Sequence, residues 1–483
     1  MHKITVLPAN LSLTAPSGSN LLSLLRDHGL APDAPCGGSG KCGKCTVFID
    51  GEAVLACHTT IHRDMTVTIP PQSDLSILHS GISTVTSCAK DDFSIAFDIG
   101  TTTVVCYLLR GGEEISVCSA PNPQRAYGAD VVSRLRSAMG SDFDTLCALI
   151  RQCMTELIQR MCETAHISPA QVITLSVVGN PAMQQIFLGI PVHNLVTIPF
   201  APALTEARRI PCAEILSVCP NADLLIVPDI SGYVGADTLG CVLSTALYQS
   251  EQPILLVDIG TNGEMVLGSK VRMVACSTAA GPALEGANIC FGMSASAGAI
   301  DHVWLEEGKI HHSVIGGGKA TGICGSGLID AVAAALELGL INKRGRILHE
   351  SRIIPITEEI CLTQDDIRQV QLAKGAIHAG IQLMLKHLGL QADDISKVML
   401  AGAFGSFLNP ASACRIGLLP MQLQNRIEAV GNAAGSGAKL LSAHRDMLSL
   451  TNTLVKKIEY LELASLPAFP KTFAKAIEFP CSG

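Results

Sequence analysis

Four cysteines lie close together near the start of the chain, and their spacing limits what the first domain can be. Cys36, Cys42, Cys45 and Cys57 are separated by gaps of five, two and eleven residues in CGGSGKCGKCTVFIDGEAVLAC. The two-residue gap lets a pair of thiolates reach one iron from a single turn, and the glycines let backbone amides approach the cluster sulfurs. A zinc site would instead need two close Cys or His pairs. The pattern predicts a [2Fe-2S] cluster bound by these four cysteines, and therefore an electron carrier.

The first 80 residues, which contain this motif, resemble the plant-type ferredoxin family. The five-residue first gap and the short last gap depart from photosynthetic ferredoxins. The resemblance implies an α+β ferredoxin domain of the β-grasp type over residues 1–79, followed by a short linker over residues 80–92. The expected elements are strands that include Ile4 and Val6, Val47 and Ile49, and Val67 and Ile69, and an early helix from about Asn20 to His28.

The length and composition predict about three globular domains and limit the choice of partner. The chain has 483 residues, only 16% of them charged, with a formal net charge of −8 and no basic run. We therefore expect no nucleic-acid partner and no anionic membrane surface as partner. No apolar run reaches the roughly 18 residues that span a bilayer.

Nineteen cysteines would suggest disulfides in a secreted chain, but no charged leader followed by an apolar signal segment is visible. We therefore expect a reducing, cytoplasmic location. Most of the fifteen cysteines outside the cluster motif are expected to be small core residues.

An internal repeat is the second strong feature of the chain. SIAFDIGTTTVVCYL at 94–108 recurs as LLVDIGTNGEMVLG at 255–268, with Asp98 and Asp258 at equivalent positions. Each copy is expected to form strand, sharp turn, strand, so that turn N–H groups can cradle phosphate while the aspartate holds hydrated Mg²⁺. One such turn could serve the backbone alone. Two copies about 160 residues apart predict duplicated subdomains with facing phosphate loops.

A third segment offers a place for a nucleobase. VMLAGAFGSFLNP at 398–410 is expected to form a strand and a turn, with Gly402 and Gly405 allowing a flat base to approach the backbone.

From about residue 93 to 483 the chain resembles the acetate kinase, sugar kinase, Hsp70 and actin superfamily, whose two RNase H-like halves clamp ATP. The resemblance implies α/β halves at 93–250 and 251–440, and a C-terminal segment at 441–483 that packs back on the ATPase. It implies that Asp98 to Thr103 and Asp258 to Glu264 are phosphate loops, that Ala401 to Gly405 is the adenosine-side element, and that Gly281 and Glu285 lie near the ribose or base. The residues expected to bind nucleotide are Gly100, Thr101, Thr102, Thr103, Gly260, Thr261, Asn262, Gly263, Glu264, Gly281, Glu285, Gly402 and Gly405.

Several other segments have a structural explanation beside a functional one. The glycine turns at 322–331 and 431–438 are expected to open helices near the nucleotide, although helix capping and close packing would also account for them. Asn180 and Asp229 are candidate cleft residues, with capping or hinge packing as the alternative. PDISGYVGAD at 228–237 has the glycines expected of a mobile connection. Asp130 is expected to cap a helix. A second, mainly buried helix is expected from about Asp365 to His387. Within it, Lys374 is more easily explained as a solvated side chain than as a nucleotide contact.

The combination of cluster and clamp resembles the reductive activators of corrinoid-dependent enzymes. The match rests on CGGSGKCGKC, DIGTTT, the NPQ…GAD segment, GNPAM, DIGTNGE and AGAFG, and covers almost the whole chain. It implies ATP-dependent transfer of one electron to an inactive Co(II) corrinoid protein, which regenerates Co(I) for methyl transfer. It also implies an upstream low-potential reductant and a homodimer, with Asp98 and Asp258 as the catalytic carboxylates. Larger relatives carry an extra region after the ferredoxin, where this chain has only about a dozen residues.

Three other functions remain open at the level of sequence. An activator of 2-hydroxyacyl-CoA dehydratases would share the ATPase half, but such activators typically share a [4Fe-4S] cluster between subunits. A small-molecule kinase with a redox sensor would need a substrate pocket with a catalytic base. An ATP-switched binding module like Hsp70 would not need the four cysteines.

Overall fold

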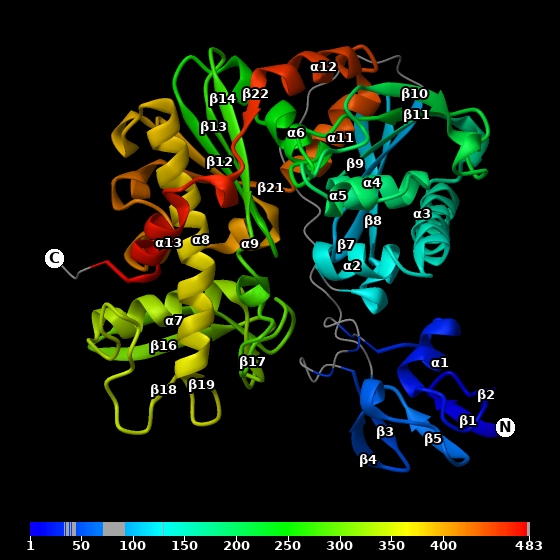
Figure 1. Ribbon diagram of the computed structural model, residues 1–483, viewed down its shortest axis with the longest axis horizontal. Helices are drawn as coiled ribbons and strands as arrows, with labels where there is room; N and C mark the ends of the chain where they lie inside the picture. The colour runs from blue at the N-terminus through cyan, green and yellow to red at the C-terminus, as the bar shows by residue number, and fades with distance from the viewer. Residues whose placement is uncertain are drawn as a thin grey trace.

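The computed structural model describes residues 1–32, 34, 38, 40, 45–70, 92–128 and 130–480, and the structural statements below concern these residues. Figure 1 shows a small N-terminal unit in blue, a first sheet with its helices in light blue to green, and a second sheet with its helices in green to red. Of the cluster cysteines, Cys36 and Cys42 lie outside the described residues, as does most of the predicted linker.

The N-terminal unit is a five-stranded sheet with one helix packed on it. Its strand order is β2-β1-β5-β3-β4, in which β1 and β5 are parallel and the other pairs are antiparallel. This arrangement confirms the predicted β-grasp ferredoxin fold. The elements are β1 (His2–Leu7), β2 (Leu11–Ala15), α1 (Leu21–Asp27), β3 (Thr46–Ile49), β4 (Glu52–Leu55) and β5 (Met65–Thr68).

Two six-stranded sheets, whose strand orders match over five strands, form most of the rest of the described chain. The orders are β10-β11-β9-β6-β7-β8 and β21-β20-β12-β13-β14-β22. In each sheet three consecutive antiparallel strands are followed by a later strand that lies parallel to the first of them. The first sheet comprises β6 (Phe93–Ile99), β7 (Thr103–Arg110), β8 (Glu113–Pro121), β9 (Val172–Gly179), β10 (Arg208–Pro211) and β11 (Asp223–Ile226). The second comprises β12 (Ile254–Ile259), β13 (Gly263–Gly268), β14 (Met273–Thr278), β20 (Lys397–Ala401), β21 (Ile427–Gly431) and β22 (Ile458–Tyr460).

This repeated order confirms the duplication read from the two DIGT segments, and it is the fold expected of a two-lobed RNase H-like ATPase. Smaller sheets extend the second half: β15 (Ala299–Glu306), β16 (Lys309–Val314) and β17 (Gly322–Ile323) form one, and β18 (Ile353–Pro355) and β19 (Cys361–Thr363) form another.

The helices cover both faces of each large sheet (Figure 1). In the first half they are α2 (Val131–Ala138), α3 (Phe143–Thr164), α4 (Pro181–Leu188), α5 (His193–Val196) and α6 (Ala236–Ser244). In the second half they are α7 (Gly325–Glu337), α8 (Gln364–Leu388), α9 (Gly402–Phe407), α10 (Pro410–Arg415), α11 (Ala433–Ala443), α12 (Met447–Lys457) and α13 (Phe469–Ile477).

Local signals explain the ends of several helices. Asp130 caps α2 through a capping box, as the sequence predicted. The predicted long helix is α8, which begins after the capping residue Thr363 and ends at Gly389, whose φ of 69° is left-handed. The glycine turns at 322–331 and 431–438 do open helices, namely α7 and α11.

The two large sheets share one core between them. On β6, Ile95 and Phe97 point to the outer core under α2, α3 and α4, whereas Ala96 points to the shared core. Helices α6 and α11 lie in this shared core, and Figure 1 shows them between the sheets. They touch at glycines, because a Cβ built on Gly437 would lie only 2.2 Å from the carbonyl oxygen of Gly240. A side chain at this crossing would separate the halves.

Helix α11 follows β21 in the second half of the chain but packs on the first sheet, against β6 and β9. Ser176 Oγ donates a 2.6 Å hydrogen bond to the Ala438 carbonyl, and Lys439 forms a 2.8 Å ion pair with Glu114. The two halves are therefore joined by polar as well as apolar contacts.

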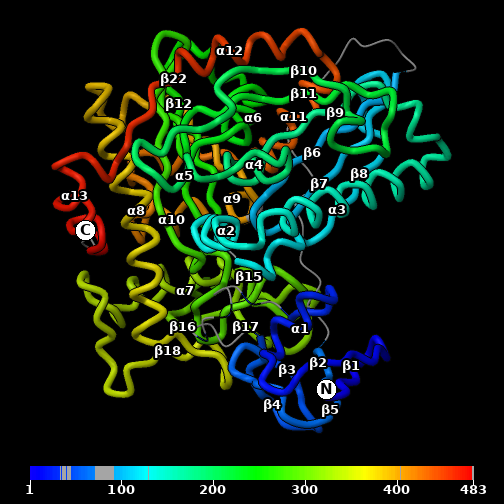
Figure 2. The backbone as a smooth tube through the Cα atoms, turned by 45° about the vertical axis from the view of Figure 1, so that its right-hand side comes forward, coloured from blue at the N-terminus to red at the C-terminus, as the bar shows by residue number. Residues whose placement is uncertain are grey.

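The C-terminal residues up to 480 pack mainly on the second half, and α12 also contacts α6 of the first half. Strand β22 lies parallel to β14, and α13 packs beside α8, as Figure 2 shows in red and yellow. Lys374 of α8 is 1% exposed, donates to the carbonyl of Glu478 and lies 5.1 Å from the centre of the Phe479 ring. The expectation of a solvated Lys374 is therefore wrong, because the C-terminal segment covers this side chain.

Two other sequence expectations need correction. The segment at 398–410 does not form strand and turn; β20 passes directly into α9 at Gly402, whose φ is 84°. The glycines of 228–237, expected in a mobile connection, are tightly packed: a Cβ on Gly232 would lie 1.9 Å from the Phe200 carbonyl oxygen.

No helix within the described part of the chain is long and apolar enough to cross a membrane. Thirteen cysteines outside the cluster motif fall within the described residues, all of them as free thiols, and most are buried, as expected of small core residues.

Candidate iron–sulfur and nucleotide sites

Two of the four predicted cluster ligands can be placed, and they converge. Cys45 precedes β3 and is 1% exposed, and Cys57 lies in the short 3₁₀ helix Ala56–His58. Their sulfur atoms are 3.2 Å apart. The Ala56 amide donates to the Cys45 carbonyl, and Asn20 Nδ2 donates to the Cys57 carbonyl, so the backbone holds both thiols in place. The pair fits two ligands of one iron–sulfur cluster.

Asp98 lies at the end of β6, where the first repeated turn begins. Asn432 Nδ2, at the start of α11, donates a 2.8 Å hydrogen bond to Asp98 Oδ2. Burial raises the pKa of Asp98 to about 7; the hydrogen bond from Asn432 opposes the rise, and the Asp237 carboxylate adds to it. Asp98 is therefore close to its titration point at neutral pH.

Three side chains brace the loop that follows Asp98. Asn122 Nδ2 donates 2.8 Å to the Gly100 carbonyl, and Asn180 Nδ2 donates 3.1 Å to Thr101 Oγ1. Arg134, which is fully buried, donates 2.8 Å to the Thr101 carbonyl. Burial lowers the pKa of Arg134 to about 9. Asn180 thus contacts the first loop, and it also caps α4, as the structural alternative predicted.

The rest of the first loop is held by its own strands. The carbonyl of Thr102 accepts from the backbone amide of Asn122 at 2.9 Å, and a Cβ built on Gly100 would lie 2.9 Å from the Thr103 carbonyl oxygen. The backbone therefore turns tightly here, as a phosphate-binding loop requires.

Asp258 lies at the equivalent place on β12. It pairs in register with Glu264 of β13, and Cys241 of α6 donates from 3.8 Å to its Oδ2. Burial raises the pKa of Asp258 to about 7, and the Asp237 and Asp98 carboxylates add to the rise. Burial also raises the pKa of Glu264, again with Asp237 and Asp258 as contributors. The two repeated aspartates are therefore close enough to influence each other across the halves.

Asp237 is a site residue that the sequence reasoning missed. It lies at the start of α6 in GADTLG, and its carboxylate accepts a 2.7 Å hydrogen bond from the Thr238 amide. Burial raises its pKa to about 6. The charge of Asp237 adds to the raised pKa values of Asp98, Asp258 and Glu264. An acid two residues after a glycine, in the first turn of a helix, was the available signal.

Asp229 lies behind this group. It is 1% exposed, and Gln184 Nε2 donates 3.0 Å to its Oδ1. Burial raises its pKa well above the ordinary range, and Asp237 adds to the rise. Its burial and its hydrogen bond from Gln184 fit the packing alternative.

Gly281 and Glu285 lie against the second loop. Thr261 Oγ1 donates 2.8 Å to Glu285 Oε2, and the Gly281 amide donates 2.9 Å to the Thr261 carbonyl. The Gly260 amide in turn donates 2.9 Å to the Asn262 carbonyl, which closes the turn. Burial raises the pKa of Glu285, against the hydrogen bond from Thr261 and the charge of Arg125.

The remaining predicted glycines allow close packing. A Cβ on Gly402 would lie 2.6 Å from Asp258 Oδ1, so α9 begins directly beside this carboxylate. A Cβ on Gly405 would lie 3.1 Å from Leu400 Cβ, and one on Gly263 would lie 3.1 Å from Ile377 Cγ1. Gly402 therefore belongs to the acid group, whereas packing of helices on the sheet explains the other two.

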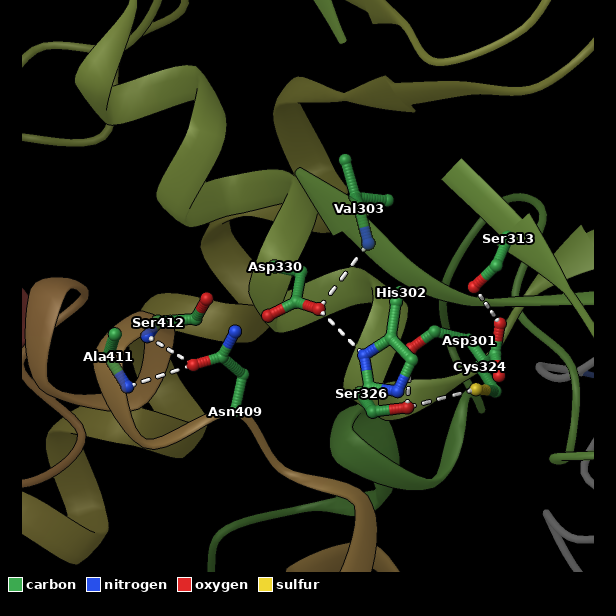
Figure 3. Close-up of polar contacts among 10 residues, drawn as sticks. All are labelled: Asp301, His302, Val303, Ser313, Cys324, Ser326, Asp330, Asn409, Ala411 and Ser412. Carbon is green, nitrogen blue, oxygen red and sulfur yellow. Dashed lines mark hydrogen bonds and ion pairs between the residues drawn. The ribbon is translucent and has the colours of Figure 1, made fainter. Parts of the chain in front are cut away.

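A polar network fixes the start of α7 behind this site (Figure 3). Ser326 Oγ donates 2.8 Å to the Asp301 carbonyl, and the buried Asp330 carboxylate accepts from the Val303 amide and lies 3.2 Å from His302 Nδ1. Gly325 packs on the Leu284 carbonyl, next to Glu285. The network thereby supports the turn that carries Glu285.

Together these observations define a class of protein: a ferredoxin unit joined to a two-lobed ATPase in which paired aspartates face each other. Family models agree along the chain. Residues 4–69 match a 2Fe-2S iron–sulfur cluster binding domain, residues 93–250 match the RACo middle region, and residues 252–483 match the C-terminal ASKHA domain of RACo.

Similar proteins are named for corrinoid activation. The chain is 34% identical over 416 residues to the corrinoid activation enzyme RamQ of Eubacterium limosum, covering 80% of this chain and 70% of that protein. It is 29% identical over 416 residues to the [Co(II) methylated amine-specific corrinoid protein] reductase of Methanosarcina barkeri, covering 78% and 75%. A solved reductive activator for corrinoid, iron–sulfur protein matches with a TM-score of 0.72 and 27% identity over 100% of this chain and 99% of that one. The chain belongs to the family of reductive activators of corrinoid proteins.

Proposed function

We propose that this protein uses ATP to transfer one electron to the Co(II) corrinoid of a partner protein, which regenerates Co(I) for methyl transfer. The observation that carries the proposal is the presence, on one chain of this family, of converging cluster thiols and a clamp with two equivalent aspartates. A ferredoxin alone needs no ATPase, and a kinase needs no cluster.

The energetic reason for ATP is the low potential of the acceptor. Plant-type clusters lie near −400 mV, and moving an electron to a lower potential costs about 2.3 kcal/mol per 100 mV. Nucleotide binding can offset this cost if the closed clamp binds the corrinoid protein in a different conformation from the open clamp. Both halves contribute to the shared core around α6 and α11, so they would stay joined there as the clamp closes.

In the nucleotide site, the chain contributes amides, hydroxyls and carboxylates. We assign the turn amides and hydroxyls around Gly100 to Thr103 and Gly260 to Gly263 to the phosphates. We assign Asp98 and Asp258 to orienting Mg²⁺ or the attacking water, and Asp237 to the same group. Proton uptake near pH 7 by these acids suits a site that handles the proton released on ATP hydrolysis.

Mg²⁺ fits this donor set. It is usually held by one or two carboxylates, several waters and the substrate phosphates. The part of the chain described here contains no preformed group of three or more His, Cys, Asp or Glu ligands. Asp98 and Asp258 would therefore hold the ion together with the nucleotide.

In the ferredoxin unit, Cys45 and Cys57 would bind the cluster together with Cys36 and Cys42. The cluster, when bound, supplies the single electron. The fixed backbone around Cys45 and Cys57 keeps both thiols in position before the cluster binds. We further propose a low-potential reductant as the electron source, a homodimeric assembly, and a cytoplasmic location in which the many thiols stay reduced.

The direct test mixes the reduced, cluster-containing protein with a Co(II) corrinoid protein, with and without ATP and Mg²⁺, and follows cobalt by its absorption. We expect Co(I) to form only with ATP, and an EPR spectrum of the reduced protein typical of a [2Fe-2S] cluster. Equal reduction without ATP would contradict the proposal, and a [4Fe-4S] spectrum would favour a dehydratase activator instead.

A further inference from the structure

The ferredoxin unit touches the first half of the clamp at a defined place. The guanidinium of Arg26, in α1, lies over the ring of Tyr127 at 5.6 Å from its centre. Burial raises the pKa of Tyr127, and the carboxylates of Asp142 and of Asp27 from α1 add to the rise. Two neighbouring residues of α1 therefore act on this tyrosine, and Figure 1 shows the blue unit next to the cyan half.

Arg26 is also next to the cluster-binding loop. A Cβ built on Gly38 would lie 3.6 Å from Nη2 of Arg26 and 3.1 Å from Cδ2 of Leu22. Gly38 has a φ of 94° and lies between the first two cluster cysteines in sequence. The contact with Tyr127 is thus one side chain away from the loop that would hold the cluster.

On the other side, Tyr127 ends a short 3₁₀ helix, Pro123–Tyr127, that is fastened to the first phosphate loop. At its start, the side chain of Asn122, 1% exposed, donates to the Gly100 carbonyl, and its backbone amide donates to Thr102. At its end, Arg134 Nη2 donates 2.7 Å to the Gly128 carbonyl and 2.8 Å to the Thr101 carbonyl. The 3₁₀ helix cannot move without moving the loop.

The charge of Arg125, in the same helix, acts on an acid of the second half of the clamp. Arg125 opposes the rise in the pKa of Glu285, which accepts a hydrogen bond from Thr261 of the second phosphate loop. Residues 122–128 therefore contact the ferredoxin unit and the first phosphate loop, and the charge of Arg125 reaches Glu285 beside the second loop. Among the described residues, this segment joins the places where electron and nucleotide would bind.

We propose that residues 122–128 form the docking surface for the ferredoxin unit of the same chain, with Arg26 on the Tyr127 ring, and that nucleotide binding changes the strength of this docking. The second part rests on the ATP clamp proposed above. A single cation–π pair is weak enough to open and close, which suits a carrier that must receive and deliver an electron. By linkage, docking must also change nucleotide affinity by the same factor.

The test uses hydrogen–deuterium exchange of the full, cluster-containing chain, with and without a non-hydrolysable ATP analogue and Mg²⁺. In the wild type, we expect the analogue to change exchange both in α1 and in residues 122–128. In Tyr127→Ala and Arg26→Ala, we expect α1 to exchange about two- to fivefold faster and to lose its response to the analogue. The double variant should show no larger effect than either single one.

Two matched variants separate docking from folding. Tyr127→Phe keeps the ring face and should keep the response of α1. Arg63→Ala removes another exposed arginine of the ferredoxin unit, one paired with Asp50 inside that unit, and should leave the response unchanged. Exchange in β1 and β5 reports whether the ferredoxin fold is intact.

A full response of α1 in Tyr127→Ala and Arg26→Ala would overturn the docking surface, as would a wild-type α1 that ignores a bound analogue. Calorimetric titration of the analogue distinguishes these outcomes from failure of the clamp itself. If the analogue did not bind to the wild type, the ATP site would be wrong, and with it the nucleotide part of this proposal.

Discussion

The two phosphate loops have the same backbone topology but different partners. Asp98 is held by the amide of Asn432 from α11, whereas Asp258 is approached by the thiol of Cys241 from α6. Helices α6 and α11 follow equivalent strands, and each reaches the aspartate of the opposite half. The first loop is braced by amides and a guanidinium, and the second by the carboxylate of Glu285.

This difference indicates that duplication kept the geometry while the chemistry diverged. The second loop carries Glu264 opposite Asp258, so acid groups concentrate there. The first loop offers neutral and positive groups behind its amides, which suits phosphate oxygens. We expect the second loop to be the side of Mg²⁺ and water, and the variants below test that assignment.

Asp258→Ala should have the largest effect. Loss of a group that orients metal or water in the second loop should lower the ATPase rate roughly 10²–10⁴-fold. The visible absorption of the cluster should stay unchanged, because the ferredoxin unit is separate. The control is Asp393→Ala, which removes an exposed acid. A normal ATPase rate in Asp258→Ala would show that the catalytic carboxylate lies elsewhere.

Gly402→Ala should come next, because it disturbs the second loop without removing an acid. The new Cβ would lie 2.6 Å from Asp258 Oδ1 at a φ of +84°. We expect the free energy of unfolding to fall by about 1–3 kcal/mol, measured by denaturant titration, and the ATPase rate to fall at least tenfold. Gly318→Ala is the matched control, since Gly318 has the same φ with nothing within 4 Å. If Gly402→Ala and Gly318→Ala had equal effects, backbone strain alone would explain them.

Asp237→Asn should shift pH profiles. Asp98 and Asp258 have pKa values of about 7, above their ordinary value of 3.8, and the charge of Asp237 contributes to both. Because these acids must lose protons to act, the ATPase rate should rise with pH through about 7. Without the charge of Asp237, the pKa values of Asp98 and Asp258 should fall, so Asp237→Asn should move this rise in rate to lower pH.

The same shift predicts the sign for stability. A carboxyl whose pKa is raised by folding stabilises the fold below about pH 3.8 and loses that contribution as pH rises through about 7. The nucleotide-free protein should therefore lose stability over this window, and Asp237→Asn should lose less. Thermal melts from pH 4 to 8 measure this loss of stability. If the wild type and Asp237→Asn lost stability with the same slope, Asp237 would lie away from Asp98 and Asp258.

The last comparison concerns the partners of the two aspartates. Asn432→Ala removes the hydrogen bond to Asp98 and the cap of α11, so the free energy of unfolding should fall by about 2–3 kcal/mol. Cys241→Ala removes only a weak thiol donor and should cost about 1 kcal/mol. Asn432→Asp keeps the cap acceptor and adds a like charge, so it should raise the pKa of Asp98. If Asn432→Ala and Cys241→Ala lowered the free energy of unfolding equally, the two aspartates would not differ in how strongly their partners hold them.

Family and function were readable from local patterns. The cysteine spacing, the two DIGT turns and the AGAFG segment each depend on residues close together in sequence, and the family comparisons confirm the activator prediction. Helix α8 was predictable from its apolar period and its final glycine. The wrong prediction at Gly402 also came from a local pattern. Glycines after a strand suggest a turn, and only the structure shows that α9 begins directly after β20.

The repeat by itself determined that two similar halves with an aspartate each must exist, since strand, turn and strand are encoded within fifteen residues. Only the tertiary structure decided that α6 and α11 cross between the sheets, that Asp237 and Asn432 join the repeated acids, and that the C-terminal segment buries Lys374. These contacts join residues up to 334 positions apart, and burial, which sets the charges of the acids, depends on the packing of both halves together.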